Sequence, residues 1–374
     1  MATDETRRAR ASFALYDAAG RIEASGEGDA EAGDEALTVG PVALDWLDAD
    51  GLLAAEHALT LDRWPSGRLV VSKLGRRFDT FAAAVREARD RARVSGFLAH
   101  GVDDPLPFGG AVLDPPPVRE ARLLAYATHL TAVPREGDPF QVPYGAVAGL
   151  RLDADRHAVA LQTADGEVVL GRLARDTDAF HSAIRSARDA QARRLADLSG
   201  EAVFADGLGV ARSALRRIDE LARAFAAPER EAGLPALLGT ADPLEAVRFG
   251  FVELLDLDEQ LAPAARELPD HVASFLLVPA RRLVILEVLA GPSAATYVFE
   301  GDIEEVNRDL QAVHFRRRPL SLSEKEAELT PSNPYRLALR KLPALQRLRA
   351  ATRARLNHGP GWEAALAKSI GAAP

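Results

Sequence analysis

The residues best suited to bind a ligand are three consecutive arginines, Arg316, Arg317 and Arg318, which follow His314 and Phe315. Three guanidinium groups can surround a phosphate, because each presents a planar fork of N–H donors, and the nearby aromatic ring could stack on a base. A solvated strand end or an internal ion pair would account for the same run without any ligand. We take Arg316, Arg317 and Arg318 as the candidate anion-binding residues.

No motif in the chain predicts catalysis, a cofactor or a metal. The eight histidines form no HxH or HExxH pair, and the absence of cysteine excludes disulfides and thiolate zinc sites. Gly207 and Gly209 begin like a dinucleotide loop, but Arg212 stands where the third glycine is needed. Walker A and GxSxG sequences are absent. We predict no catalytic, cofactor-binding or metal-binding residues. If the chain is an enzyme, its site would have to form between units, without a linear motif.

Two acidic pairs resemble the opening of a calcium loop. Asp48 and Asp50 precede Gly51, and Asp153 and Asp155 repeat the spacing, but the third acid and the terminal glutamate of such a loop are missing. We therefore interpret both pairs as turn residues.

The elements that would position these residues are indicated by an internal repeat. Residues 66–90 and 165–189 start 99 positions apart, align without a gap and are identical at 11 of 25 positions. Each copy predicts a short β-branched strand that leads into a helix. Phe81 and Phe180 fall on the apolar face of that helix, whereas Arg86, Arg89 and Arg93 are expected on the opposite, solvated face.

The repeat extends towards the N-terminus with small changes of length. Residues 40–50 parallel 145–155, and His57 parallels His157, so we expect these two histidines to have a structural role. Residues 23–35 are rich in Gly, Ala, Asp and Glu and are predicted to form a solvated loop. Residues 101–117, with paired glycines and three consecutive prolines, have the composition of a linker.

Short strands in two groups, closed by one C-terminal amphipathic helix and present in tandem, resemble pleckstrin-homology-like modules. The resemblance covers roughly residues 10–98 and 118–198, and less clearly 270–315, and it rests on element order and on Phe81 and Phe180. The tryptophan usual in the closing helix of that family is absent from both copies. The acidic segment 23–35 lies where the family would place a basic, lipid-binding hairpin, which argues against lipid headgroup binding.

The predicted fold class is α+β, a tandem repeat of small antiparallel β-barrel or sheet units, each closed by an amphipathic helix. We expect a helical linker region and a third β-rich segment, which is either a degenerate copy or unrelated. The predicted divisions are residues 1–100, 118–200, 201–265 (mainly helical), 266–320 (third β and helix segment) and 321–374 (basic and helical).

Charge is distributed unevenly along the chain. The net charge is −9; residues 316–358 hold 11 Arg and Lys against three Glu, or +8, which leaves −17 for the remainder. Such asymmetry can mark a partner surface. We favour the simpler interpretation that the basic segment folds onto the acidic body.

Composition also bears on the cellular compartment. The chain contains no run of about 18 apolar residues, so we predict no membrane span. The acidic start of the chain does not resemble a signal peptide, and there is no cysteine, so we expect a cytoplasmic protein.

These observations leave three function classes open. The first is a non-enzymatic binding or scaffold protein that presents strand edges or loops to a protein partner. The second is a polyanion binder, for nucleic acid or a phosphate ligand, that uses Arg316–Arg318 and the basic helices around residues 336–355; the net acidic charge argues against it. The third is an enzyme with a site between units. Oligomeric state is not predicted.

Overall fold

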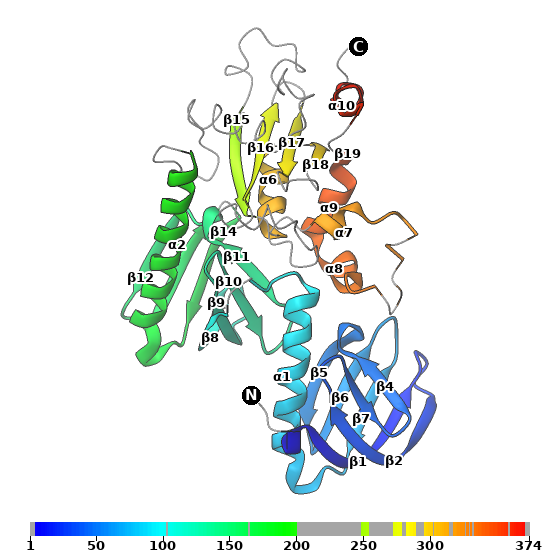
Figure 1. The fold of residues 1–374 in the computed structure, drawn as a ribbon. Helices are drawn as coiled ribbons and strands as arrows, with labels where there is room; N and C mark the ends of the chain where they lie inside the picture. The colour runs from blue at the N-terminus through cyan, green and yellow to red at the C-terminus, as the bar shows by residue number, and fades with distance from the viewer. Residues whose placement is uncertain are drawn as a thin grey trace.

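The computed structural model describes residues 4–101, 104–163, 165–199, 248–253, 272–278, 282–288, 295–301, 303–313, 317–325, 327–328, 330, 333–357 and 360–370. Three sheets account for its strands (Figure 1). Among the described residues, none of the helices combines the length and the apolar character that crossing a membrane requires.

The first sheet has seven antiparallel strands in the order β4-β3-β2-β1-β7-β6-β5. They are β1 (Arg8–Tyr16), β2 (Ile22–Ala32), β3 (Ala36–Val39), β4 (Val42–Asp45), β5 (Ala49–Ala55), β6 (Ala58–Arg63) and β7 (Arg68–Ser72). A short 3₁₀ helix, η2 (Trp46–Asp48), joins β4 to β5. Because β4 and β5 end the strand order without pairing to each other, the sheet is not a closed barrel.

One face of this sheet is covered by α1 (Phe78–Gly96). Phe81, Val85 and Ala88 follow one another at helical spacing and are buried against Trp46 and the strands of the sheet. The Trp46 indole N–H donates to the Gly33 carbonyl at 3.0 Å, which satisfies the polar atom of this large buried side chain. The predicted role of Phe81 as the anchor of the closing helix is confirmed.

The second sheet repeats the first. Its order is β11-β10-β9-β8-β14-β13-β12, with the same antiparallel pairing. The strands are β8 (Leu106–Asp114), β9 (Arg119–Ala125), β10 (His129–Pro134), β11 (Phe140–Pro143), β12 (Gly149–Asp153), β13 (Ala158–Thr163) and β14 (Gly166–Gly171). The 3₁₀ helix η4 (Tyr144–Ala146) lies between β11 and β12, and α2 (Thr177–Ser199) buries Phe180 and Ile184 in the core. The predicted duplication is confirmed.

Matching turns adopt matching backbone conformations. Lys73 and Arg172 both have φ of 57°, and His57 and His157 have φ of 59° and 47°. Residues other than glycine rarely adopt this left-handed backbone conformation. Its recurrence at paired positions therefore shows that the copies share turn geometry as well as topology. The two histidines occupy equivalent turns just before β6 and β13, as expected of structural residues.

Two segments predicted as loop or linker are strands. Residues 23–32 belong to β2, and cations balance its glutamates: Glu31 pairs with Arg8 of the neighbouring strand β1 at 3.2 Å, and Glu27 pairs with Lys73, directly after β7, at 2.9 Å. Residues 106–114 of the predicted linker form β8, the first strand of the second sheet. The proposed match of residues 40–50 with 145–155 is also wrong, since η2 and η4 are the equivalent elements.

The C-terminal region forms a five-stranded antiparallel sheet in sequential order, β15 to β19. Its strands are β15 (Arg248–Glu253), β16 (Val272–Val278), β17 (Leu283–Val288), β18 (Ala295–Glu300) and β19 (Thr352–Asn357). Helices α6 (Ile303–Ala312), α7 (Arg317–Ser321), α8 (Arg336–Lys341) and α9 (Pro343–Ala351) lie between β18 and β19, and α10 (Trp362–Ile370) follows. The three strands and helix predicted within 266–320 are present, but this strand order differs from that of the two copies.

Two further predictions concern this region and the segment before it. Residues 352–357, predicted as helix, form β19, which pairs with β18. The predicted helical region 201–265 lies outside the described residues except for 248–253, and that part is strand β15.

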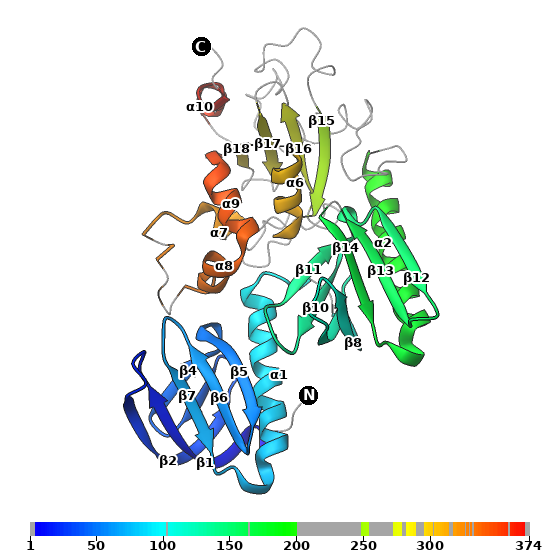
Figure 2. The same cartoon turned by 180° about the vertical axis from the view of Figure 1, so that it is seen from behind.

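The three parts meet around the C-terminal end of α1, as Figures 1 and 2 show. Val94 of this helix and Phe97 directly after it pack against Leu124 and Val133 of the second sheet and against Leu337 of α8. The neighbouring Leu98 enters the core of the C-terminal region. α1 therefore has two buried faces, one towards its own sheet and one towards the rest of the chain.

Candidate functional site

The predicted arginine site is only partly described. Arg316 lies outside the described residues, Arg317 begins α7 but its side chain is not described, and Arg318 is exposed on α7. Within the described part of the chain, the structure therefore does not show the three arginines converging on a common site.

Arginines of the basic C-terminal segment pair with groups of the same chain. Arg347 pairs with Asp309 of α6 at 2.5 Å, and Arg349 donates to the carbonyls of Pro319 and Leu322. Arg353 pairs with Glu300 at 3.2 Å. These contacts confirm that much of the basic segment folds onto acidic and polar groups of the same chain.

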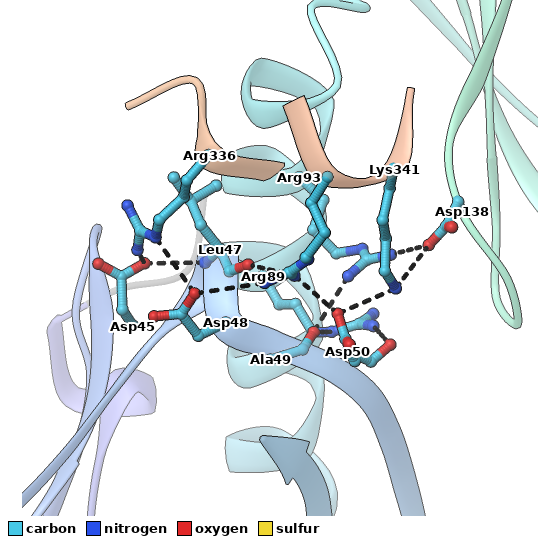
Figure 3. Close-up of polar contacts among 11 residues, drawn as sticks. Asp45, Leu47, Asp48, Ala49, Asp50, Arg89, Arg93, Asp138, Arg336 and Lys341 are labelled. Atoms are coloured by element: carbon cyan, nitrogen blue, oxygen red, sulfur yellow. Dashed lines mark hydrogen bonds and ion pairs between the residues drawn. The ribbon is translucent and has the colours of Figure 1, made fainter. Parts of the chain in front are cut away.

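A cluster of charged side chains lies where α8 meets the first sheet (Figure 3). Arg336 is 3% exposed and pairs with Asp45 at 2.6 Å and Asp48 at 3.1 Å. Arg340 and Lys341 both reach Asp50 at 2.9 Å. We call these six residues the α8 clasp. Asp48 and Asp50 thus serve an inter-unit contact rather than the turn predicted for them; Asp153 does have that role, because it accepts from the Arg156 backbone N–H at 3.1 Å.

Two arginines of α1 complete the junction. Arg89 and Arg93 are 6% and 1% exposed, so the prediction that they lie on a solvated face is wrong. Arg89 donates to the carbonyls of Ala49 and Asp50 at 3.2 and 2.9 Å, and Arg93 donates to Ala49 at 3.0 Å. Their long side chains reach past the helix to the start of β5, where an edge strand has carbonyls without strand partners.

The second copy uses its equivalent arginine in the same way. Arg188 lies 99 positions after Arg89, and its guanidinium donates to the carbonyl of Ala148, the residue directly before β12, at 3.5 Å. The pairing of Arg89 and Arg188 in the repeat was the sequence signal for this role.

Asp138 connects the second sheet to the same cluster. It lies before β11, is hydrogen-bonded by Arg93 and is 3.9 Å from Lys341. Figure 3 shows Arg93, Lys341 and Asp138 side by side, contributed by α1, α8 and the second unit. All three parts of the chain therefore share one charge network.

Burial sets the electrostatics of this network. Burial, together with the nearby charge of Arg93, lowers the pKa of Arg89 to about 10, and burial also lowers the pKa of Arg93 although Asp138 and Asp50 oppose it. For Arg336, burial acts to lower the pKa, but hydrogen bonds to Asp45 and Asp48 outweigh it and the pKa is raised. Arg336 is thus well matched to its carboxylates, whereas the cations of α1 are held at an electrostatic cost.

An open groove of about 580 Å³ runs between the middle of α1 and the outer face of the second sheet. Its lining is mainly charged and includes four arginines and three acids: Arg86, Arg122, Arg135, Arg172, Glu87, Asp90 and Glu120. Two glycines of β8, Gly109 and Gly110, form part of the wall. Sequence reasoning did not find this groove, because its residues come from two units.

The described residues hold no group of three or more His, Asp or Glu side chains arranged to bind a metal ion. The charge network and the groove offer guanidinium and carboxylate groups, which can recognise charged ligands. No protein-family model matches the chain, and no curated protein matches it.

Proposed function

We propose that this chain is a non-enzymatic cytoplasmic scaffold whose two repeat units are pleckstrin-homology-like modules, and that it engages a protein partner at the edge of the first sheet. Support for the family comes from the strand order that both sheets share. In each sheet the two end strands do not pair with each other, and one helix follows the last strand. A scaffold needs a fixed arrangement of its modules, and the α8 clasp supplies contacts that would maintain one.

The observation that carries the proposal is the character of β5. It ends the sheet, and Leu53 near its middle is 61% exposed. Edge strands carry unpaired backbone groups that can accept a further strand, and exposed apolar side chains on them add affinity. The equivalent edge strand β12 carries Arg151 instead, paired with Glu167 at 3.2 Å, and a charge on an edge strand discourages pairing.

Only part of β5 would be free to pair. The carbonyls of Ala49 and Asp50 are occupied by Arg89 and Arg93, so an added strand would run along residues 51–55. This short stretch could accommodate about one anchoring side chain beside Leu53. We therefore expect an extended apolar segment of the partner rather than a helix.

The test selects peptides from a displayed random library on the immobilised full chain. We expect peptides with alternating apolar residues, and we expect Leu53→Glu to weaken their binding at least about tenfold, as measured by fluorescence anisotropy. Leu106→Glu is the matched control, because Leu106 is 57% exposed but lies on β8 of the other sheet. Failure to recover such peptides, or equal weakening by both variants, would contradict the proposal.

Polyanion binding through Arg316–Arg318 remains a separate prediction. The internal pairing of Arg336 and Arg347 removes support from the neighbouring basic helices. Such binding would weaken steeply with salt, and its absence at low ionic strength would eliminate this reading.

A further inference from the structure

The groove between α1 and the second sheet has an unusual centre. Arg122 lies on β9, where it is opposite Gly109 of β8 on one side and Val133 of β10 on the other. Directly opposed residues share a face of the sheet, so all three face the groove that they line. A Cβ atom at Gly109 would meet no atom within 4 Å, so there is open space beside Arg122.

Three of the four guanidinium groups in the groove have no hydrogen-bond or ion-pair partner within the described part of the chain. Arg135 is paired with Glu120 at 3.3 Å. Within the described part of the chain, Arg86, Arg122 and Arg172 make no hydrogen bond and no ion pair within 4.0 Å. The Nε atom of Arg122 is moreover buried and without a hydrogen-bond partner. A buried donor left unpaired costs free energy, which a bound acceptor would recover.

Two carboxylates in the groove, Asp90 and Glu87, partly offset the positive charge of the arginines. Asp90 is largely buried, which raises its pKa, while Arg122 and Arg89 act in the opposite direction. Glu87 lies one helical turn before it towards the same groove. Counting the three unpaired arginines against these two acids leaves the groove with one excess positive charge.

We propose that this groove binds a phosphate monoester, carried by a small molecule or by a phosphorylated side chain. A phosphate monoester has three terminal oxygens, and the groove offers three unpaired guanidinium groups; a carboxylate offers only two oxygens. The open side of the groove admits the rest of the ligand. The site is separate from the β5 edge, so either can fail without the other.

The experiment titrates the full chain with phenyl phosphate, inorganic phosphate, a phosphoserine peptide and glutarate by calorimetry. We expect saturable binding of phenyl phosphate, and Arg122→Gln should weaken it at least about tenfold. Arg172→Gln, a change at an exposed residue, should weaken it with no change in the unfolding midpoint. Arg156→Gln, an exposed arginine of the same unit outside the groove, should bind as the wild type does.

A gain of affinity provides the second readout. Glu87→Gln removes a negative charge that repels the phosphate, so it should tighten phenyl phosphate binding several-fold. Simple damage to the fold would not tighten binding. Tighter binding of the phosphoserine peptide than of inorganic phosphate would support the site and identify a protein source, whereas the reverse order would support it and identify a small-molecule source. Absence of phosphate binding, or equal binding of glutarate, would overturn the proposal.

Discussion

Arg89 and Arg188 occupy the same position in two copies of one unit, yet their surroundings differ. Arg89 is buried with hydrogen bonds to two carbonyls, whereas Arg188 is half-buried with one long contact. We expect Arg89→Met to lower the free energy of unfolding by about 2 kcal/mol, because the Asp50 carbonyl loses its charged donor.

Arg188→Met is the internal control for this change and should cost less than about 1 kcal/mol. Urea unfolding of the two variants, followed by circular dichroism, measures the difference. Equal losses would mean that burial does not distinguish the two arginines.

At this scale the sequence predicted residues whose role is local. Phe81, Phe180 and the two turn histidines were predicted correctly, because helical spacing and the repeat fix their surroundings. Arg89, Arg93, Asp48 and Asp50 were not, because their partners are edge-strand carbonyls or cations almost 300 residues away. Periodicity reports which face a residue is on, but it does not report what a long side chain can reach.

At the scale of elements, α8 has only six residues, and a helix of that length needs tertiary contacts to be stable. Its polar contacts include the α8 clasp and the cation–π contact of Arg340 with the Trp64 ring, at 4.6 Å from the ring centroid, and Leu337 packs into the apolar junction. We expect Asp48→Asn with Asp50→Asn to loosen α8, seen as faster amide hydrogen exchange over residues 336–341.

The same measurement contains its control. Exchange over α2, which does not contact the clasp, should stay unchanged. Unaltered protection of α8 in the double variant would show that the charges of Asp48 and Asp50 are not needed to hold the helix. Partly exposed ion pairs are screened, so wild-type α8 should also exchange faster at high salt.

Elements with strong periodicity were predictable and those with charged or Gly-rich sequences were not. The closing helices and the strands before them follow from apolar spacing. The acids of β2 predict a solvated loop, although cations on β1, on β6 and directly after β7 pair with them. β19, with alternating arginines, was read as a helix because its edge position and its pairing with β18 cannot be seen locally.

For the whole molecule, the apolar junction matters as much as the charges. Phe97 is 4% exposed among residues of all three parts. We expect Phe97→Ala to cost about 3 kcal/mol and to separate transitions that coincide in the wild type. Single-tryptophan variants that keep Trp46 or Trp362 would report the first sheet and the C-terminal region.

Coincident transitions in Phe97→Ala would show that the parts are coupled elsewhere. The duplication allowed the two sheets to be predicted, but the manner in which they meet was not predictable. Contacts between α8 and η2 join residues 288 positions apart, and nothing in local composition specifies such a pairing.

The α8 clasp has a consequence for how the chain is made. Asp45, Asp48 and Asp50 leave the ribosome roughly 290 residues before the cations that neutralise them, a delay of about 15 to 60 s at ordinary rates of synthesis. Both duplicated sheets can form during this interval, while Asp45, Asp48 and Asp50 of the first sheet still lack their partners from α8. The α8 clasp therefore cannot form until residues 336–341 have been synthesised, and in a truncated product that ends before residue 336 these three aspartates would lack their α8 partners.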